Sequence, residues 1–211
     1  MRAILLLALL AACSEYRVDH GPKTQPVDPA AAPLDEQGSP PDWQTCRGGY
    51  YGLYFNLSGN DPRVGPDADP APADPSGLDW WSRDDLAFQR YDPSIDFGDN
   101  WWPVDEGLQD DPRYFTTEWT AWVRVWSRTD MRVLLGAADD AWVLVDDEVV
   151  ASVADSPDLE ASGIDVRMSP GQYPVKILFA HRNAMAASFR FRVTDGDVTF
   201  CYPDFSSDTG Q

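Results

Sequence analysis

The feature that most constrains this chain is an alternation of apolar and polar residues with period two from Tyr114 to Ser127 (YFTTEWTAWVRVWS). Successive side chains of a β-strand point to opposite faces, so this spacing predicts a strand. The face turned toward the core would carry every second residue, namely Phe115, Thr117, Trp119, Ala121, Val123 and Val125. A helix would instead repeat its apolar residues every three or four positions, and no long stretch of the following sequence keeps that period. The chain is therefore expected to be all-β.

Further runs rich in aromatic and β-branched residues recur between turn signals. They predict strands over 49–57, 131–135, 141–145, 149–153, 164–168, 173–180, 188–193 and 197–202. Asp146-Asp147 is expected in a hairpin turn, and the Asp/Pro-rich residues 60–77 in a long loop. In the run SFRFRV at 188–193 the aromatic residues should face inward and both arginines outward. Many short strands at this spacing indicate an antiparallel β-barrel or sandwich.

The N-terminus (MRAILLLALLAACS) has the composition of a secretory signal. Arg2 precedes an apolar stretch that ends at Leu10, well short of the roughly 20 residues that span a bilayer as a helix. The segment LAAC that ends at Cys13 resembles the lipobox of bacterial lipoproteins, which implies cleavage after residue 12 and lipidation of Cys13. Two or more acyl chains give stable anchoring. The alternative is an ordinary signal peptide that contains a cysteine.

The resemblance to lipoproteins also implies a location. Ser14, rather than aspartate, follows the lipidated cysteine, as in lipoproteins of the outer membrane of diderm bacteria. No later run approaches 18 apolar residues, so membrane contact is expected through the lipid anchor only. Residues 14–44 contain six prolines and few large apolar residues, the composition of a disordered tether. The expected organisation is a signal peptide (1–12), a tether (13–44), one β-domain (45–204) and a polar tail (205–211).

Two of the three cysteines remain once Cys13 is assigned to lipid. Cys46 and Cys201 flank nearly all of the sequence that is expected to fold. Cysteines outside the cytoplasm are usually oxidised, so we expect a disulfide that links the two ends of the domain. Two free thiols are the alternative.

The net charge of −19 on 211 residues argues against nucleic acid as a partner, because phosphates require a basic surface. It also argues against binding of anionic lipid headgroups by the folded surface. Of the two histidines, His20 lies in the tether and His181 in a loop, so there is no paired-histidine metalloenzyme motif, and there is no GxSxG elbow. The chain is expected to be non-catalytic, although an acidic protein always offers carboxylate pairs of the glycosidase type.

Five segments in order resemble the PA-fourteen family, first described in anthrax protective antigen. They are GYYGLYF at 49–55, DPSIDF at 92–97, the strand 115–123, ADDAWVLVDDEVV at 138–150, and the stretch 173–193 that opens with YPVKI. The resemblance covers about residues 48–195 and implies an antiparallel β-barrel or sandwich. Ala121 and Ala141 stand where the family usually has glycine.

Sugar-binding members of that family, including yeast flocculins, bind calcium through an aspartate pair that corresponds here to Asp139 and Asp140. The resemblance implies that Asn183, with the backbone carbonyls of Met185 and Ala187, completes the six to eight oxygens that calcium requires. A cis peptide between the two aspartates would turn both carboxylates to one side. The alternative is a member that retains the scaffold and has lost the metal.

Sugar sites often include an aromatic platform, and the pairs Trp80-Trp81 and Trp101-Trp102 both fall in expected loops. Trp101 and Trp102 are our candidates for contact with the ligand, and packing in the core is the alternative. Together these residues predict a calcium-dependent carbohydrate-binding module of the lectin or adhesin type. Its partner would be a glycan or cell-surface polysaccharide. The competing hypothesis is a scaffold that binds another envelope protein and needs neither metal nor sugar.

The lipobox yields a direct prediction. Replacing Cys13 with serine removes the thiol that accepts the diacylglycerol, so the variant should stay uncleaved and should not incorporate a palmitate analogue in cells. Metabolic labelling followed by gel electrophoresis measures both effects. Labelling of Cys13→Ser at the level of the unmodified chain would contradict the assignment.

Overall fold

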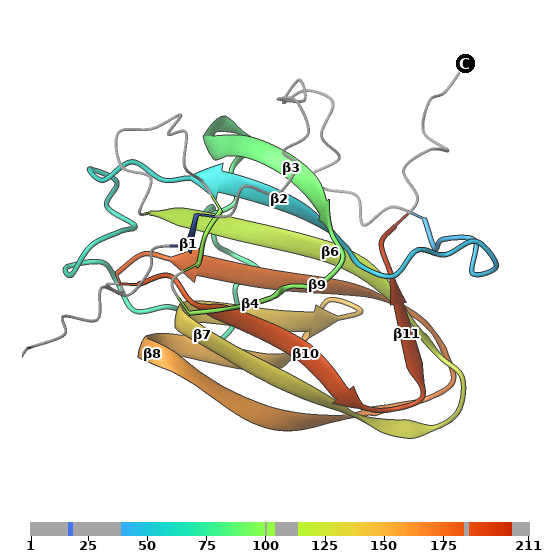
Figure 1. Cartoon of the computed structure of the whole chain (residues 1–211). Helices are drawn as coiled ribbons and strands as arrows, with labels where there is room; N and C mark the ends of the chain where they lie inside the picture. The colour runs from blue at the N-terminus through green and yellow to red at the C-terminus, as the bar shows by residue number, and fades with distance from the viewer. Residues whose placement is uncertain (1–16, 19–38, 100, 104–113, 184–185, 204–211) are drawn as a thin grey trace, which may run out of the picture.

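The computed structural model describes residues 17–18, 39–99, 101–103, 114–183 and 186–203. The proposed signal peptide, Cys13, Met185 and the tail 205–211 lie outside these residues. Nine strands form one curled antiparallel sheet (Figure 1). They are β2 (Tyr50–Asn56), β3 (Leu86–Asp92), β4 (Asp96–Gly98), β6 (Phe115–Val125), β7 (Thr129–Val145), β8 (Glu148–Met168), β9 (Gly171–His181), β10 (Phe189–Asp195) and β11 (Val198–Cys201).

Two short strands, β1 (Arg17–Val18) and β5 (Trp101–Trp102), pair in parallel apart from this sheet. A 3₁₀ turn over Arg83–Asp85 is the one helical element in the described part of the chain. Within that part no helix has the length and apolar character needed to cross a membrane.

The sheet order is β3-β2-β6-β9-β7-β10-β4, with β8 beside β7 and β11 beside β6. Two long strands each change partner along one edge. β6 pairs with β9 along its whole length, while its other edge is shared by β2 and β11. β7 pairs with β8 on one side and with first β10 and then β9 on the other. The change of partner on β7 lets the sheet fold over, so that β10 and β4 pack across the core from β6 (Figure 1).

The all-β prediction is confirmed. All six residues of β6 that were expected to face inward are buried, but Thr116, Glu118 and Thr120 on the opposite face are buried too. The turn at Asp146-Asp147 also lies where the sequence predicts it, with positive φ at both residues, as tight hairpin turns require. The predicted segments 131–135 and 141–145 join into the single strand β7, and 149–153 and 164–168 into β8. Each strand continues through its junction, where the ladder between β7 and β8 is irregular around Asp139. Strand β3 was not predicted.

Aromatic rings from both layers meet in the core. Trp119 of β6 stacks against Phe189 of β10, with ring centres 4.9 Å apart, and meets the edge of Tyr54 at 6.0 Å. Trp119, Phe189 and Tyr54 are completely buried. Pairs of this geometry contribute about 0.5–1.5 kcal/mol each beyond the area that they bury.

A buried carboxylate, Asp92, lies among these rings. It accepts hydrogen bonds from the Tyr54 hydroxyl at 2.5 Å, from Trp119 Nε1 at 2.9 Å and from Arg90 Nε at 2.7 Å. Burial raises the pKa of this carboxyl, opposed by the charge of Arg90 and by these hydrogen bonds. Gly52 is required beside it, because a Cβ at that position would lie 2.8 Å from Trp119 Cδ1 and 2.9 Å from Asp92 Oδ2. The family-like GYYGLYF segment thus has a steric reason for its second glycine.

The network around Asp92 should be essential for stability. Asp92→Ala leaves the guanidinium of Arg90, which is 5% exposed, without this carboxylate in the core. We expect a loss of about 3–5 kcal/mol in the free energy of unfolding, measured by urea denaturation. Asp130→Ala is the matched control, because its ion pair with Arg167 is exposed and should contribute under about 1 kcal/mol. Equal losses in the two variants would contradict this account.

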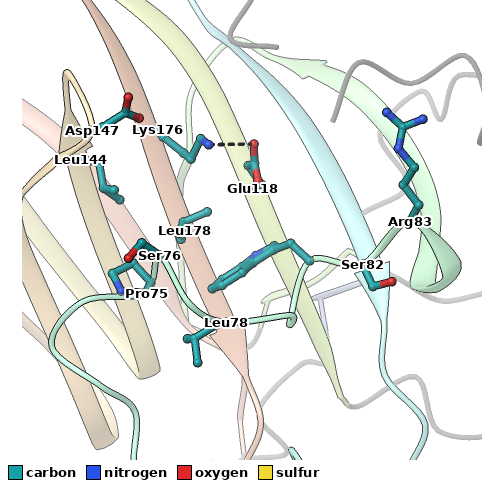
Figure 2. Close-up of a pocket in the computed structure, with 11 residues that line it drawn as sticks. Pro75, Ser76, Leu78, Ser82, Arg83, Glu118, Leu144, Asp147, Lys176 and Leu178 are labelled. Carbon is teal, nitrogen blue, oxygen red and sulfur yellow. Dashed lines mark ion pairs between the residues drawn. The ribbon is translucent and has the colours of Figure 1, made fainter. Parts of the chain in front are cut away.

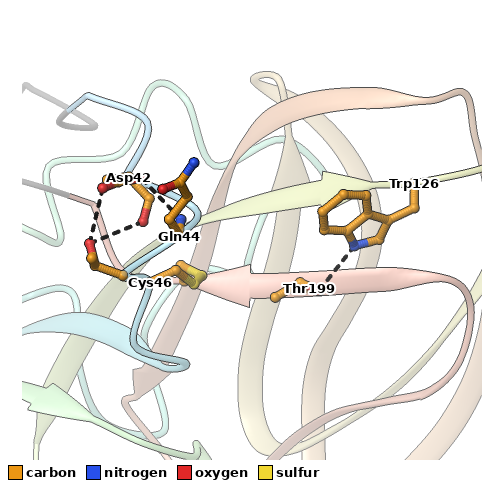
Figure 3. Close-up of a disulfide and its surroundings, with 7 residues drawn as sticks. Asp42, Gln44, Cys46, Trp126 and Thr199 are labelled. Carbon is orange, nitrogen blue, oxygen red and sulfur yellow. Dashed lines mark hydrogen bonds between the residues drawn. A yellow bond between two sulfur atoms is a disulfide. The ribbon is translucent and has the colours of Figure 1, made fainter.

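The disulfide between Cys46 and Cys201 is present, with 6.0 Å between the Cα atoms, as the sequence predicts (Figure 3). Its position follows from the sheet. Strands β2 and β11 lie end to end along the same edge of β6, because Tyr51 pairs with Thr120 and Cys201 pairs with Trp122. The bridge therefore joins the segment that enters β2 to the end of β11, across 155 residues of sequence.

Removing this bridge should destabilise the domain without changing its fold. We expect the double variant Cys46→Ser/Cys201→Ser to lose about 2–5 kcal/mol, since the unfolded chain gains the freedom of a long open loop. Thermal unfolding of the variant, and of the unmodified chain with and without reductant, measures the loss. An unchanged melting temperature in both comparisons would show that strand pairing alone closes the domain.

Candidate functional site

The predicted metal residues Asp139 and Asp140 lie at the point where β7 changes partner. The ladder between β7 and β8 is irregular on both sides of Asp139, whose φ is +77°. A bulge of this kind redirects the side chains next to it. The expected cis peptide is not found, as the described residues contain none. The left-handed conformation of Asp139 redirects the chain instead.

The Asp139 carboxylate binds the end of β9. Its Oδ2 accepts the backbone N–H groups of Arg182 at 2.8 Å and of Asn183 at 2.9 Å. The ring of His181 lies close, with Nε2 3.9 Å from the same oxygen. The structure thus brings the irregular part of β7 that carries Asp139 and Asp140 next to Asn183, which follows β9.

The Asp140 carboxylate is paired with Arg182. Nε and Nη2 of this arginine lie 2.9 and 2.8 Å from Asp140 Oδ2. Both side chains are almost completely buried, at 1% exposed for the aspartate and 4% for the arginine. Nη1 donates to the backbone carbonyls of Arg63 at 2.9 Å and Asp69 at 3.2 Å, and the guanidinium lies 4.0 Å from the centre of the Trp80 ring.

These contacts decide whether the described residues fit calcium. A calcium ion requires six to eight oxygens directed at one centre. Here Asp139 and Asp140 receive N–H donors, the side chain of Asn183 is exposed, and the carbonyl of Ala187 accepts the N–H of Trp101 at 2.8 Å. No group of three His, Cys, Asp or Glu side chains suited to a metal occurs among the described residues. This arrangement does not fit a calcium ion, and calcium binding stays a prediction from the sequence.

The predicted platform residues lie inside the protein. Trp101 is 3% exposed and Trp102 is 5% exposed. Trp101 stacks on Phe97 with ring centres 3.9 Å apart, and Trp102 meets the edge of His181 at 5.1 Å. The structure therefore assigns this pair to the core, where neither indole offers a face to a ligand.

The other tryptophan pair belongs to the loop that covers the outer face of β9 and β7. Trp80 packs there with buried residues of the two strands: Trp142, Leu144, Leu178 and Ala180. Three hydrogen bonds fix the loop to the sheet: Thr116 Oγ1 to the Trp80 carbonyl (2.7 Å), Trp81 Nε1 to the Thr117 carbonyl (3.1 Å) and Trp142 Nε1 to the Pro72 carbonyl (3.1 Å).

A pocket of about 640 Å³ opens where this loop ends (Figure 2). Its lining comes from the loop, from β6, β7 and β9, and from the hairpin turn: Pro75, Ser76, Leu78, Trp81, Ser82, Arg83, Glu118, Leu144, Asp147, Lys176 and Leu178. We call it the Trp81 pocket. It combines a half-buried indole and other apolar side chains with hydroxyl, acidic and basic groups that could orient a ligand.

An ion pair lies in the Trp81 pocket. Lys176 Nζ is 3.8 Å from Glu118 Oε1, and Figure 2 shows the two side chains directed toward each other. Since Leu178 is opposite Glu118 and Lys176 is opposite Thr120, the charged residues are diagonal neighbours on adjacent strands. The Glu118 side chain is 10% exposed and the Lys176 side chain 26%. The ammonium thus remains partly accessible beside a nearly buried carboxylate.

Sequence reasoning did not find the Trp81 pocket. The alternation in β6 places Glu118 on the face opposite the core, which suggests solvent, but the loop covers that face. The role of Arg182 was not predicted from the sequence either. The signal was available, because a basic residue lies next to Asn183, which was expected near Asp139 and Asp140.

By sequence, the chain matches no family model and no curated protein. Its fold resembles those of solved structures. The A domain of epithelial adhesin 6 from Candida glabrata, in complex with Galb1-3GlcNAc, is 12% identical, with a TM-score of 0.52 over 80% of this chain and 93% of that one. The A domain of epithelial adhesin 9, in complex with Galb1-4GlcNAc, is 11% identical, with a TM-score of 0.50 over 81% and 96%.

An α-xylosidase from Xanthomonas citri is also similar in part, at 12% identity and a TM-score of 0.46. The match covers 74% of this chain, which spans 17% of the length of that enzyme. The likenesses to the two adhesin domains show the fold, a β-sandwich type.

Proposed function

We propose that this protein is a non-catalytic carbohydrate-binding module and that the Trp81 pocket holds the sugar. The observation that carries the proposal is the combination, in one open pocket, of an indole and an acid–base pair. The proposed ligand is a glycan or cell-surface polysaccharide.

Each part of the pocket suits one part of a pyranose. The C–H face of a sugar ring is apolar and packs on an aromatic ring, which supplies area with little loss of conformational entropy. The hydrogen bond from Trp81 Nε1 to the Thr117 carbonyl fixes the orientation of this indole before a ligand arrives. The carboxylate of Glu118 accepts and the ammonium of Lys176 donates, so neighbouring hydroxyls of one sugar can bond to both.

The comparisons support this proposal at the level of the scaffold. The two adhesin domains that share the fold are described in complexes with galactose-containing disaccharides. A PA-fourteen type of domain and a lipid anchor at Cys13 in the outer membrane complete the proposal. In it the tether 13–44 holds the binding domain away from the membrane, as in an adhesin. Calcium has no part in the proposal.

Removal of the Trp81 indole tests the proposal most directly. Trp81→Ala should weaken binding to glycans, measured on a glycan array and then by calorimetry with the best ligand, by about tenfold or more, since one such contact contributes on the order of 1.4 kcal/mol. Glu118→Gln, which retains the shape of the side chain, should weaken it as well. Trp126→Ala is the matched control, because that indole is 53% exposed beyond the other end of β6.

Two results would contradict the proposal. One is full glycan binding by a folded Trp81→Ala variant, with folding judged by its melting curve. The other is a glycan array without any bound ligand, combined with stoichiometric capture of an envelope protein, which would favour the scaffold hypothesis.

A further inference from the structure

We propose that the guanidinium of Arg182 serves as a built-in cation at the Asp139–Asp140 pair, in the place where the family resemblance implies a divalent metal. The loops of this domain would then be held together without calcium. The inference is independent of sugar binding, because it concerns only the partners that stabilise the two buried carboxylates.

The first argument is charge. Asp139 and Asp140 are 5% and 1% exposed. Burying an ionised carboxylate costs several kcal/mol unless a partner offsets the lost hydration. Two backbone N–H groups donate to Asp139, and Nε and Nη2 of Arg182 pair with Asp140. Arg182 therefore gives Asp140 the positive charge that a metal ion would otherwise bring.

The second argument is the chemistry of the surroundings. Three oxygens converge on the guanidinium: Asp140 Oδ2 and the backbone carbonyls of Arg63 and Asp69. Carboxylate and carbonyl oxygens are the ligands that calcium prefers. Because the planar guanidinium presents five N–H donors in a fixed fork, it can bond to all three at once, which a lysine ammonium does less well.

The third argument is connectivity. Arg182 directly follows β9, and Asp140 lies in β7. Arg63 and Asp69 belong to the loop over residues 57–82 that covers β9 and β7, which we call the covering loop. The carbonyl of Arg182 also accepts the N–H of Gly65 at 2.8 Å. One residue thus links the sheet to the loop that forms a wall of the Trp81 pocket, the task that a shared metal ion performs between loops.

The test compares calcium sensitivity before and after Arg182 is removed. The melting temperature of the unmodified chain should be the same in calcium chloride and in EDTA. Arg182→Ala should melt lower in EDTA, because Asp140 loses its partner. Calcium should then raise the melting temperature of this variant by roughly 5–10 °C at a concentration about a hundredfold above Kd. The ion would bind the oxygens that no longer have the guanidinium as a partner.

Two matched variants exclude general effects of charge. Arg167→Ala removes an arginine from an exposed ion pair and should gain no calcium response. Adding Asp140→Asn to Arg182→Ala should abolish the response, because the metal loses its carboxylate. A calcium-dependent shift in the unmodified chain would overturn the proposal, and this measurement decides the matter even if Arg182→Ala does not fold. A folded Arg182→Ala variant without a calcium response would also overturn it.

Discussion

The outer face of this domain depends on one buried ion pair, Asp140 with Arg182. Neither charge can remain buried alone, so their pairing fixes the end of β9 against the middle of β7. The remaining donors of the guanidinium fix the carbonyls of Arg63 and Asp69, and its face covers Trp80. The covering loop has no regular structure of its own, so these contacts hold it in place together with the packing of Trp80 and the hydrogen bonds to β6 and β7. The Trp81 pocket exists because that loop is held.

The position of the Asp140–Arg182 pair depends on the irregularity of β7 at Asp139. β7 is a long strand whose edge opposite β8 pairs with β10 in its first half and with β9 in its second half. The bulge at Asp139 accommodates the change of partner and turns its carboxylate toward the N–H groups that end β9. Strands that switch partners are the usual way for a sheet to fold over on itself. The same irregularity therefore closes the core on one side and organises a polar site on the other.

Much of the fold could be predicted because local pattern and burial agree in it. Strand β6, the alternation of β10, the hairpin at Asp146-Asp147 and the disulfide were all predicted. β3 was missed because Arg90 and Asp92 break its apolar pattern, and only the fold shows that they face inward to pair with each other and with Tyr54 and Trp119. A polar residue in a strand indicates a position that faces solvent unless a buried partner is known. The partners here, Tyr54 and Trp119, are distant in sequence.

The sequence by itself determined the all-β class and the cysteines that close the domain, since these depend on side-chain periodicity and composition. It also indicated that Asp139, Asp140 and Asn183 would meet. Only the tertiary structure decided what they meet with and which tryptophans reach the surface. Trp101-Trp102 and Trp80-Trp81 look alike as dipeptides, yet the first pair is in the core, whereas in the second Trp80 is buried and Trp81 lines the pocket. The physical reason is that burial and charge pairing depend on which distant segments cover a face, and strand periodicity carries no information about that cover.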